Sequence, residues 1–175
     1  QVDGVDGGWL YAVGDVNGRA LLTHVGKYQA RIAGAHIGGA SASAGPDVSA
    51  TPRVIFTSPE VGAVGLTERA ARQAGIDVAV VSHDVGKVSA AHTLGRGYKG
   101  TAQLVIDRTR QVLVGATFVG PRAGELVHSA TIAVIGEVPL HRLWHAIPAF
   151  PTISEVWLRL LETYAGDPHN WDPYP

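Results

Sequence analysis

The chain has 175 residues, 46% of them hydrophobic and 17% charged, a composition that lets a globular domain bury a core. A formal net charge of -1, with no basic run and no apolar stretch of bilayer length, argues against a nucleic-acid partner and a membrane span. The absence of Cys excludes disulfides, thiolate metal sites and a redox-active cysteine pair from this chain. There is no Met, and the first residue is Gln1, so we expect a processed or truncated product of a longer protein. No signal peptide opens the chain, and we expect a cytoplasmic location.

The first part of the chain is predicted to contain one strand and one helix. Residues 9–13 form an apolar run that predicts a buried strand, and Gly14 with Asp15 ends it in a turn. Apolar residues recur at helical spacing over residues 20–37, and a Gly-Gly pair follows them. Residues 40–51 are mostly small and polar and include a proline, so they are predicted to be a linker.

After the linker the pattern changes to mixed strands and helices. Thr67 is the predicted N-cap of one helix and Ser154 that of the last. In chain order we expect a strand at 53–56, a helix at 67–74, a strand at 78–81, a hairpin of 99–106 with 111–119, helices at 123–135 and 140–145, an extended segment at 147–151 and a helix at 154–164. This order predicts an α+β fold, an antiparallel sheet with helices packed on it.

Four segments of the chain carry motifs. They are YAVGD at 11–15, TSPEVGAVGLTE at 57–68, VGATFVGPRAGEL at 114–126 and PTISE at 151–155. In this order they resemble the pyridine nucleotide–disulphide oxidoreductase family, most closely its dihydrolipoamide dehydrogenase-like members. The resemblance implies the remnant of an α/β FAD-binding domain at 1–39, the linker at 40–51, a dimerisation domain at 52–165 and a tail at 166–175.

The first motif implies contacts to a flavin. In the family the matching Asp accepts a hydrogen bond from a ribityl hydroxyl of FAD, which assigns that role to Asp15, and Gly14 leaves the approach open. The next helix starts near Leu22, Thr23 and His24. Its first N–H groups and positive dipole end would face the flavin pyrimidine edge and stabilise the reduced flavin. We therefore expect FAD as the cofactor of the full-length parent, with NAD(P)H as a co-substrate bound outside this chain.

The last motif departs from the family pattern. In the family's disulphide reductases a His directly precedes Pro-Thr-x-Ser-Glu, and this His, held by the Glu, serves as acid–base for the partner's thiol pair. Here Phe150 occupies that position and has no proton to exchange, while the Glu is kept as Glu155, the remaining member of the catalytic pair. His145 lies five residues earlier, before two prolines, so we do not expect it to substitute.

The resemblance implies an FAD-dependent NAD(P)H oxidoreductase with a role in cell redox homeostasis, working as a homodimer through residues 52–165. Electrons would pass from NAD(P)H through the flavin to a small-molecule acceptor, either a disulphide such as lipoamide or, because of Phe150, a quinone. A second hypothesis is that the isolated chain is a non-catalytic dimerisation module and is itself inactive.

Histidines and tryptophans give two further expectations. A third, weaker hypothesis is a small metal-binding domain built on His141 and His145, which are four residues apart on a predicted helix. No third ligand is evident, so no metal site is predicted. Trp144 and Trp157 are expected to pack in the core or at the dimer interface, because interface cores are enriched in aromatic residues.

Overall fold

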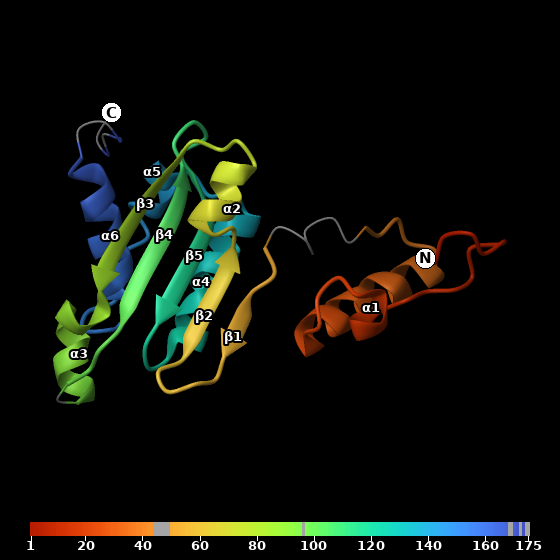
Figure 1. The fold of residues 1–175 in the computed structure, drawn as a ribbon, viewed down its shortest axis with the longest axis horizontal. Coiled ribbons are helices and arrows are strands. Elements are labelled where there is room, and N and C mark those ends of the chain that lie inside the picture. Colours follow the sequence, from red (N-terminus) through yellow and green to blue (C-terminus); the bar gives the residue numbers. More distant parts are fainter. Residues whose placement is uncertain (44–49, 96, 168–169, 172, 174–175) are drawn as a thin grey trace. The chain divides into compact units, whose positions relative to one another are not determined.

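The computed structural model of the chain describes residues 1–43, 50–95, 97–167, 170, 171 and 173. The chain divides into two compact units, Gln1–Thr51 and Pro52–Pro175 (Figure 1). The linker predicted at 40–51 lies partly outside the described residues. Within the described part of the chain, no helix combines the length and apolar character needed to cross a bilayer.

The first unit contains a short 3-10 helix, η1 (Gly14–Asn17), and a long helix, α1 (Thr23–Ile37). α1 confirms the predicted helix, although it begins three residues later than the apolar spacing suggests. The strand predicted at 9–13 is wrong, because these residues form no strand and Trp9 is 69% exposed. An apolar run indicates a tendency to be buried, whereas a strand also needs a neighbour for its backbone hydrogen bonds.

The second unit is built on a five-stranded sheet with the order β1-β2-β5-β4-β3. Its strands are β1 (Arg53–Ile55), β2 (Val61–Gly65), β3 (Val78–Asp84), β4 (Thr101–Asp107) and β5 (Val112–Val119). Every neighbouring pair is antiparallel, which confirms the predicted α+β class with an antiparallel sheet. The central strands β4 and β5 are buried over most of their length, as expected when helices cover both faces of a sheet.

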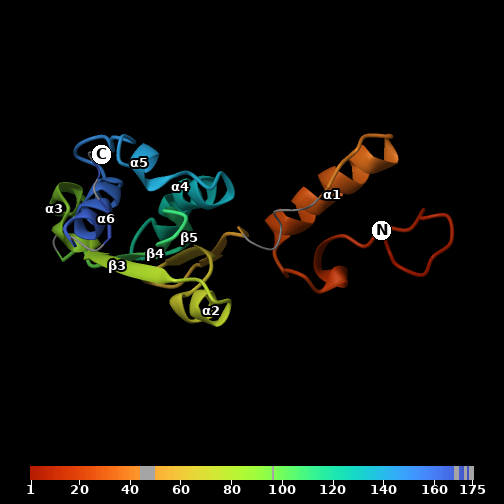
Figure 2. The same cartoon turned by 90° about the horizontal axis from the view of Figure 1, so that it is seen from above.

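Helices lie on both faces of this sheet (Figure 2). One face carries α2 (Glu68–Gln73), and the other carries α3 (Ser89–Leu94), α4 (Ala123–Ile135), α5 (Leu140–Leu143) and α6 (Glu155–Ala165). The 3-10 helix η3 (Val85–Lys87) leads from β3 to α3. α4 packs on β2 and β5, and α6 packs on β3 and β4. One face of α6 is therefore apolar and buried, through Val156, Leu160 and Tyr164.

Most predicted elements of this unit are confirmed within a few residues. α4 has the predicted bounds, and Thr67 caps α2 by accepting a hydrogen bond from the amide of Ala70 at 3.2 Å. Ser154 is the N-cap residue of α6 by position, but its side chain makes no capping hydrogen bond. The sequence patterns do not predict β2 or α3, and β3 extends three residues beyond its predicted end.

Both tryptophans singled out from the sequence pack against other aromatic rings. The ring of Trp157 lies 5.8 Å from that of the buried Phe118, between centroids. Trp144 meets Trp171 edge to face at 5.7 Å, and Trp171 also stacks on Tyr164 at 6.3 Å. The contacts of Trp171 hold part of the C-terminal tail against the chain's own domain.

Candidate functional site

The turn at the start of η1 carries the predicted flavin contact. Val13 is extended, and Gly14 has a φ of +72°, a left-handed conformation that glycine adopts without steric penalty. Gly18, with a φ of +69°, closes η1 by donating its amide to the carbonyl oxygen of Asp15 at 3.0 Å. The side chain of Asp15 is exposed at this turn, so its carboxylate can accept hydrogen bonds from a ligand.

The amino-terminal end of α1 lies beside this turn. A Cβ added at Gly26 would lie 3.2 Å from the Cα of Gly14, so the two backbones are in close contact. Leu22 is the extended N-cap residue, and its carbonyl oxygen accepts the amide of Gly26 at 3.1 Å. Thr23 and His24 follow as exposed residues of the first helical turn. The predicted flavin contacts therefore come from two adjoining segments of the first unit.

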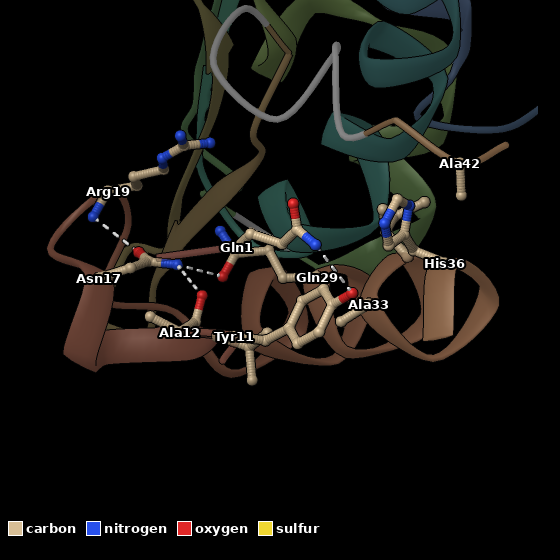
Figure 3. A pocket seen from close by; sticks show the side chains of 11 residues that line it. Gln1, Tyr11, Ala12, Asn17, Arg19, Gln29, Ala33, His36 and Ala42 are labelled. Carbon is tan, nitrogen blue, oxygen red and sulfur yellow. Dashed lines mark hydrogen bonds between the residues drawn. The ribbon is translucent and has the colours of Figure 1, made fainter. Parts of the chain in front are cut away.

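A buried side chain that the sequence analysis does not single out lies under the turn. Gln29 of α1 is only 6% exposed. Its Oε1 accepts a hydrogen bond from the amide of Gly14 at 2.8 Å. It also accepts one from Nδ2 of Asn17 at 2.7 Å, which is drawn in Figure 3. The same Nδ2 also donates to the carbonyl oxygen of Ala12 at 3.3 Å. One amide oxygen thus contacts both ends of η1.

A cavity of about 330 Å³ lies in the same unit (Figure 3). Its wall includes Tyr11, Asn17, Arg19, Gln29 and His36. The predicted flavin contacts at 14–15 and 22–24 are not part of this wall. The cavity therefore adjoins the turn through Asn17 and Gln29, but the predicted flavin contacts do not line it.

In the second unit, the motif at 151–155 joins an exposed loop to a buried helix start. Phe150 is 74% exposed, and so presents its ring to solvent in this chain. Glu155, five residues later, is the first residue of α6 and is only 6% exposed. A buried carboxylate requires charged or hydrogen-bonding partners.

Glu155 has two such partners. Oε1 accepts a hydrogen bond from Nη2 of Arg159 at 2.7 Å, and Oε2 accepts one from the amide of Ser89 at 3.2 Å. Arg159 also contacts Oε2 of Glu162 at 2.9 Å. The hydrogen bond from Arg159 lowers the pKa of Glu155, burial opposes this shift, and the Ser89 amide adds to it. Glu155 is therefore held as a carboxylate that joins α6 to α3.

His141 and His145 are both exposed. Among the described residues there is no group of three or more His, Cys, Asp or Glu side chains placed to hold a metal ion. The structure thus adds no support for the hypothesis of a metal-binding domain.

The sequence of the second unit matches a known protein family. The model for the pyridine nucleotide-disulphide oxidoreductase dimerisation domain matches residues 51–161, the stretch that contains the whole sheet. The chain belongs to this family.

Curated relatives agree with the assignment. The dihydrolipoyl dehydrogenase of Chlamydia muridarum is 37% identical over 148 residues, which cover 85% of this chain and 31% of the relative. The enzyme of the same name from Thermus scotoductus is 37% identical over 146 residues, covering 83% of this chain and 31% of the relative. The chain thus spans about a third of the length of these relatives.

Two solved structures are also similar. The HOCl-induced flavoprotein disulfide reductase RclA from Escherichia coli gives a TM-score of 0.78 at 25% identity, over 87% of this chain and 35% of that protein. LpdA from Mycobacterium tuberculosis gives a TM-score of 0.80 at 23% identity, over 87% of this chain and 33% of that one, and supports the fold alone.

Within this family, Phe150 and the pairing of Glu155 are where the chain departs from the pattern that the resemblance implies. The resemblance described above implies a His–Glu pair, but the carboxylate in this chain is engaged by Arg159. Arg159 lies four residues after Glu155 on the same helix, a spacing that the sequence already displays.

Proposed function

We propose that this chain is the C-terminal part of an FAD-dependent NAD(P)H oxidoreductase that works as a homodimer through residues 52–165. Residues 1–39 would complete the FAD-binding domain, 40–51 would link the domains, and 166–175 would form a tail. NAD(P)H would bind outside this stretch. The family match and the names of the relatives support this proposal. The cytoplasmic location and the role in redox homeostasis stay predictions.

The first unit offers residues that fit FAD. The exposed carboxylate of Asp15 would accept a hydrogen bond from a ribityl hydroxyl, and the absence of a side chain at Gly14 keeps that approach open. The first amides of α1, at Leu22, Thr23 and His24, would contact the pyrimidine edge of the ring, where the helix dipole stabilises negative charge. When bound, the flavin would supply the chemistry that accepts a hydride from NAD(P)H and passes electrons on.

The second unit favours an acceptor that needs no protein acid–base group. Phe150 carries no exchangeable proton, and Glu155 is paired with Arg159 and with the Ser89 amide. With Phe150 at the position of the family's His, this carboxylate has no imidazole to orient. The environment of Glu155 is the single observation that most favours a quinone, which takes electrons directly from reduced flavin, over a disulphide.

The proposal is tested with the FAD-loaded parent enzyme by comparing NAD(P)H-dependent turnover of lipoamide and of a quinone. General acid–base catalysis contributes about 10²–10⁴-fold, so we expect lipoamide kcat/KM to lie about 100-fold or more below that of a relative that carries the His, while the quinone is turned over. Lipoamide turnover comparable to that of such a relative would contradict the proposal.

A Phe150→His variant tests the same proposal from the other side. The new imidazole would face a carboxylate already paired with Arg159, so we expect lipoamide kcat/KM to rise by less than about tenfold, well short of a full acid–base contribution. Phe56→His is the matched control, because Phe56 is also an exposed phenylalanine of this unit, at 85%. A rise of about 10²-fold or more in Phe150→His alone would show that Glu155 still serves an acid–base pair.

The second hypothesis concerns the 175-residue chain by itself. The compact second unit favours a chain that folds and associates without catalysis. We therefore expect the isolated chain, mixed with FAD and NADH, to show no turnover and to sediment as a dimer. Flavin retention with NADH oxidation would overturn this expectation.

A further inference from the structure

A buried glutamine supports the turn that carries Asp15. Gln29 is 6% exposed, and buried polar side chains in folded proteins are almost always held by specific hydrogen bonds. Its Oε1 accepts the Gly14 amide, one residue before Asp15. It also accepts the Asn17 side chain, two residues after Asp15 (Figure 3). A single oxygen atom therefore fixes the backbone on both sides of the carboxylate.

Contacts of Gly14 and Asn17 add to the support that Gln29 gives the turn. Gly14 adopts a φ of +72° and has no side chain of its own, and a Cβ at Gly26 would lie only 3.2 Å from the Cα of Gly14. Asn17 extends the network by donating to the carbonyl oxygen of Ala12 and accepting the amide of Arg19 at 3.0 Å. These bonds set the direction in which Asp15 leaves the backbone.

We infer that Gln29 is a positioning residue, whose buried amide oxygen orients the Gly14–Asp15 turn toward the flavin. This inference rests on the proposed function of Asp15 as a flavin contact. Gln29 does not touch the cofactor itself but acts through Gly14 and Asn17. Preorganised contacts of this kind raise affinity because the ligand does not have to order the turn on binding.

The test uses the FAD-loaded parent enzyme in three variants. Gln29→Leu keeps the size of the side chain but removes the acceptor, whereas Gln29→Glu keeps an acceptor oxygen at the same reach. Gln103→Leu is the matched control, because Gln103 lies on β4 and its side chain bonds only weakly, at 3.3 Å, to Ser82. The readouts are the FAD dissociation constant, from titration of the flavin-depleted enzyme, and the visible spectrum of the bound flavin.

We expect Gln29→Leu to weaken FAD binding about tenfold, the effect of losing a buried hydrogen-bond acceptor, with a change in the flavin spectrum. Gln29→Glu should stay within about threefold of the wild type, and Gln103→Leu should match it. Unchanged FAD affinity in Gln29→Leu, or no rescue by Gln29→Glu, would overturn the inference.

Two further variants keep the result decisive. If Gln29→Leu does not fold, Asn17→Ala decides, with about threefold weaker FAD binding expected and an unchanged dissociation constant refuting the inference. Asp15→Ala distinguishes a failed role of Gln29 from a failed flavin site. If Asp15→Ala weakens FAD binding and the Gln29 variants do not, only the role of Gln29 fails. If Asp15→Ala also has no effect, the proposed flavin site fails, and the role of Gln29 with it.

Discussion

Replacing Arg159 with leucine should destabilise the chain far more than replacing an exposed arginine. Arg159 donates to a carboxylate that is 6% exposed, at a distance of 2.7 Å. In the Arg159→Leu variant, Glu155 would remain buried with only the Ser89 amide as a partner. Such a residual buried charge is the main reason why breaking one side of a buried pair is destabilising.

The magnitude follows from the exposure of the two partners. Breaking a fully buried ion pair costs about 3–5 kcal/mol, and a hydrogen bond to a charged group contributes about 1.5–3 kcal/mol. The side chain of Arg159 is 41% exposed, so water already solvates part of the pair. We therefore expect a loss of about 2 kcal/mol in the free energy of unfolding at pH 7.

The assay is urea denaturation of the chain followed by tryptophan fluorescence, because Trp157 lies on α6 and packs on Phe118. Arg72→Leu is the matched control. Arg72 and Glu68 form a pair with the same spacing at 3.0 Å, but the two side chains are 55% and 47% exposed. Exposed pairs of this kind contribute about 0.3–0.5 kcal/mol. Equal losses in the two variants would refute the reasoning.

The stability that the Glu155–Arg159 pair contributes should depend on pH. The pKa of Glu155 is lowered from its ordinary value of 4.5, chiefly by the hydrogen bond from Arg159. A carboxyl group whose pKa is lower in the folded state stabilises the fold above its unfolded pKa, and this stabilisation is lost as pH falls through the folded value. The difference between wild type and Arg159→Leu should therefore be full near pH 7 and shrink well below pH 4.5.

Two further predictions concern the core of the second unit. Burial raises the pKa of Tyr164. The neutral hydroxyl therefore stabilises the fold below about pH 10, and this contribution to the free energy of unfolding is lost as pH rises further. Tyr164→Phe should reduce that loss in alkaline denaturation curves. A Cβ at Gly115 would overlap the carbonyl oxygen of Leu66, so Gly115→Ala should lower the free energy of unfolding by about 3 kcal/mol in urea titrations. Gly34→Ala is its control, because Gly34 lies within α1 with open space around it, and there alanine should stabilise the helix by about 0.5–1 kcal/mol. An equal loss in both glycine variants would contradict the packing argument.

The sequence predicts the second unit well where the local signals agree with the packing. α4 shows the predicted bounds because its apolar residues face the sheet at helical spacing. β2 escapes prediction because its glycines dilute the strand signal. A Cβ at Gly62 would lie 2.5 Å from the carbonyl oxygen of Ala123, so glycine is required there by the close approach of α4, which no local pattern reveals.

The candidate site is predictable only in part for the same reason. The pairing of Glu155 with Arg159 can be read from their spacing on one helix. The contribution of Ser89 cannot, because Ser89 and Glu155 are 66 residues apart and meet only when α3 and α6 pack side by side. The burial of Gln29 cannot be predicted either. A polar residue inside a helix is expected to face solvent, and only the folded turn at Gly14 provides its hydrogen-bond partner.

The central claim is that the acceptor takes its electrons directly from the reduced flavin, without a thiol pair or its acid–base partner. The most direct measurement is the rate at which a quinone reoxidises the NADH-reduced, FAD-loaded parent enzyme, before and after its thiols are alkylated. An unchanged rate after alkylation is the predicted result. Loss of quinone reduction once the thiols are blocked would contradict the account.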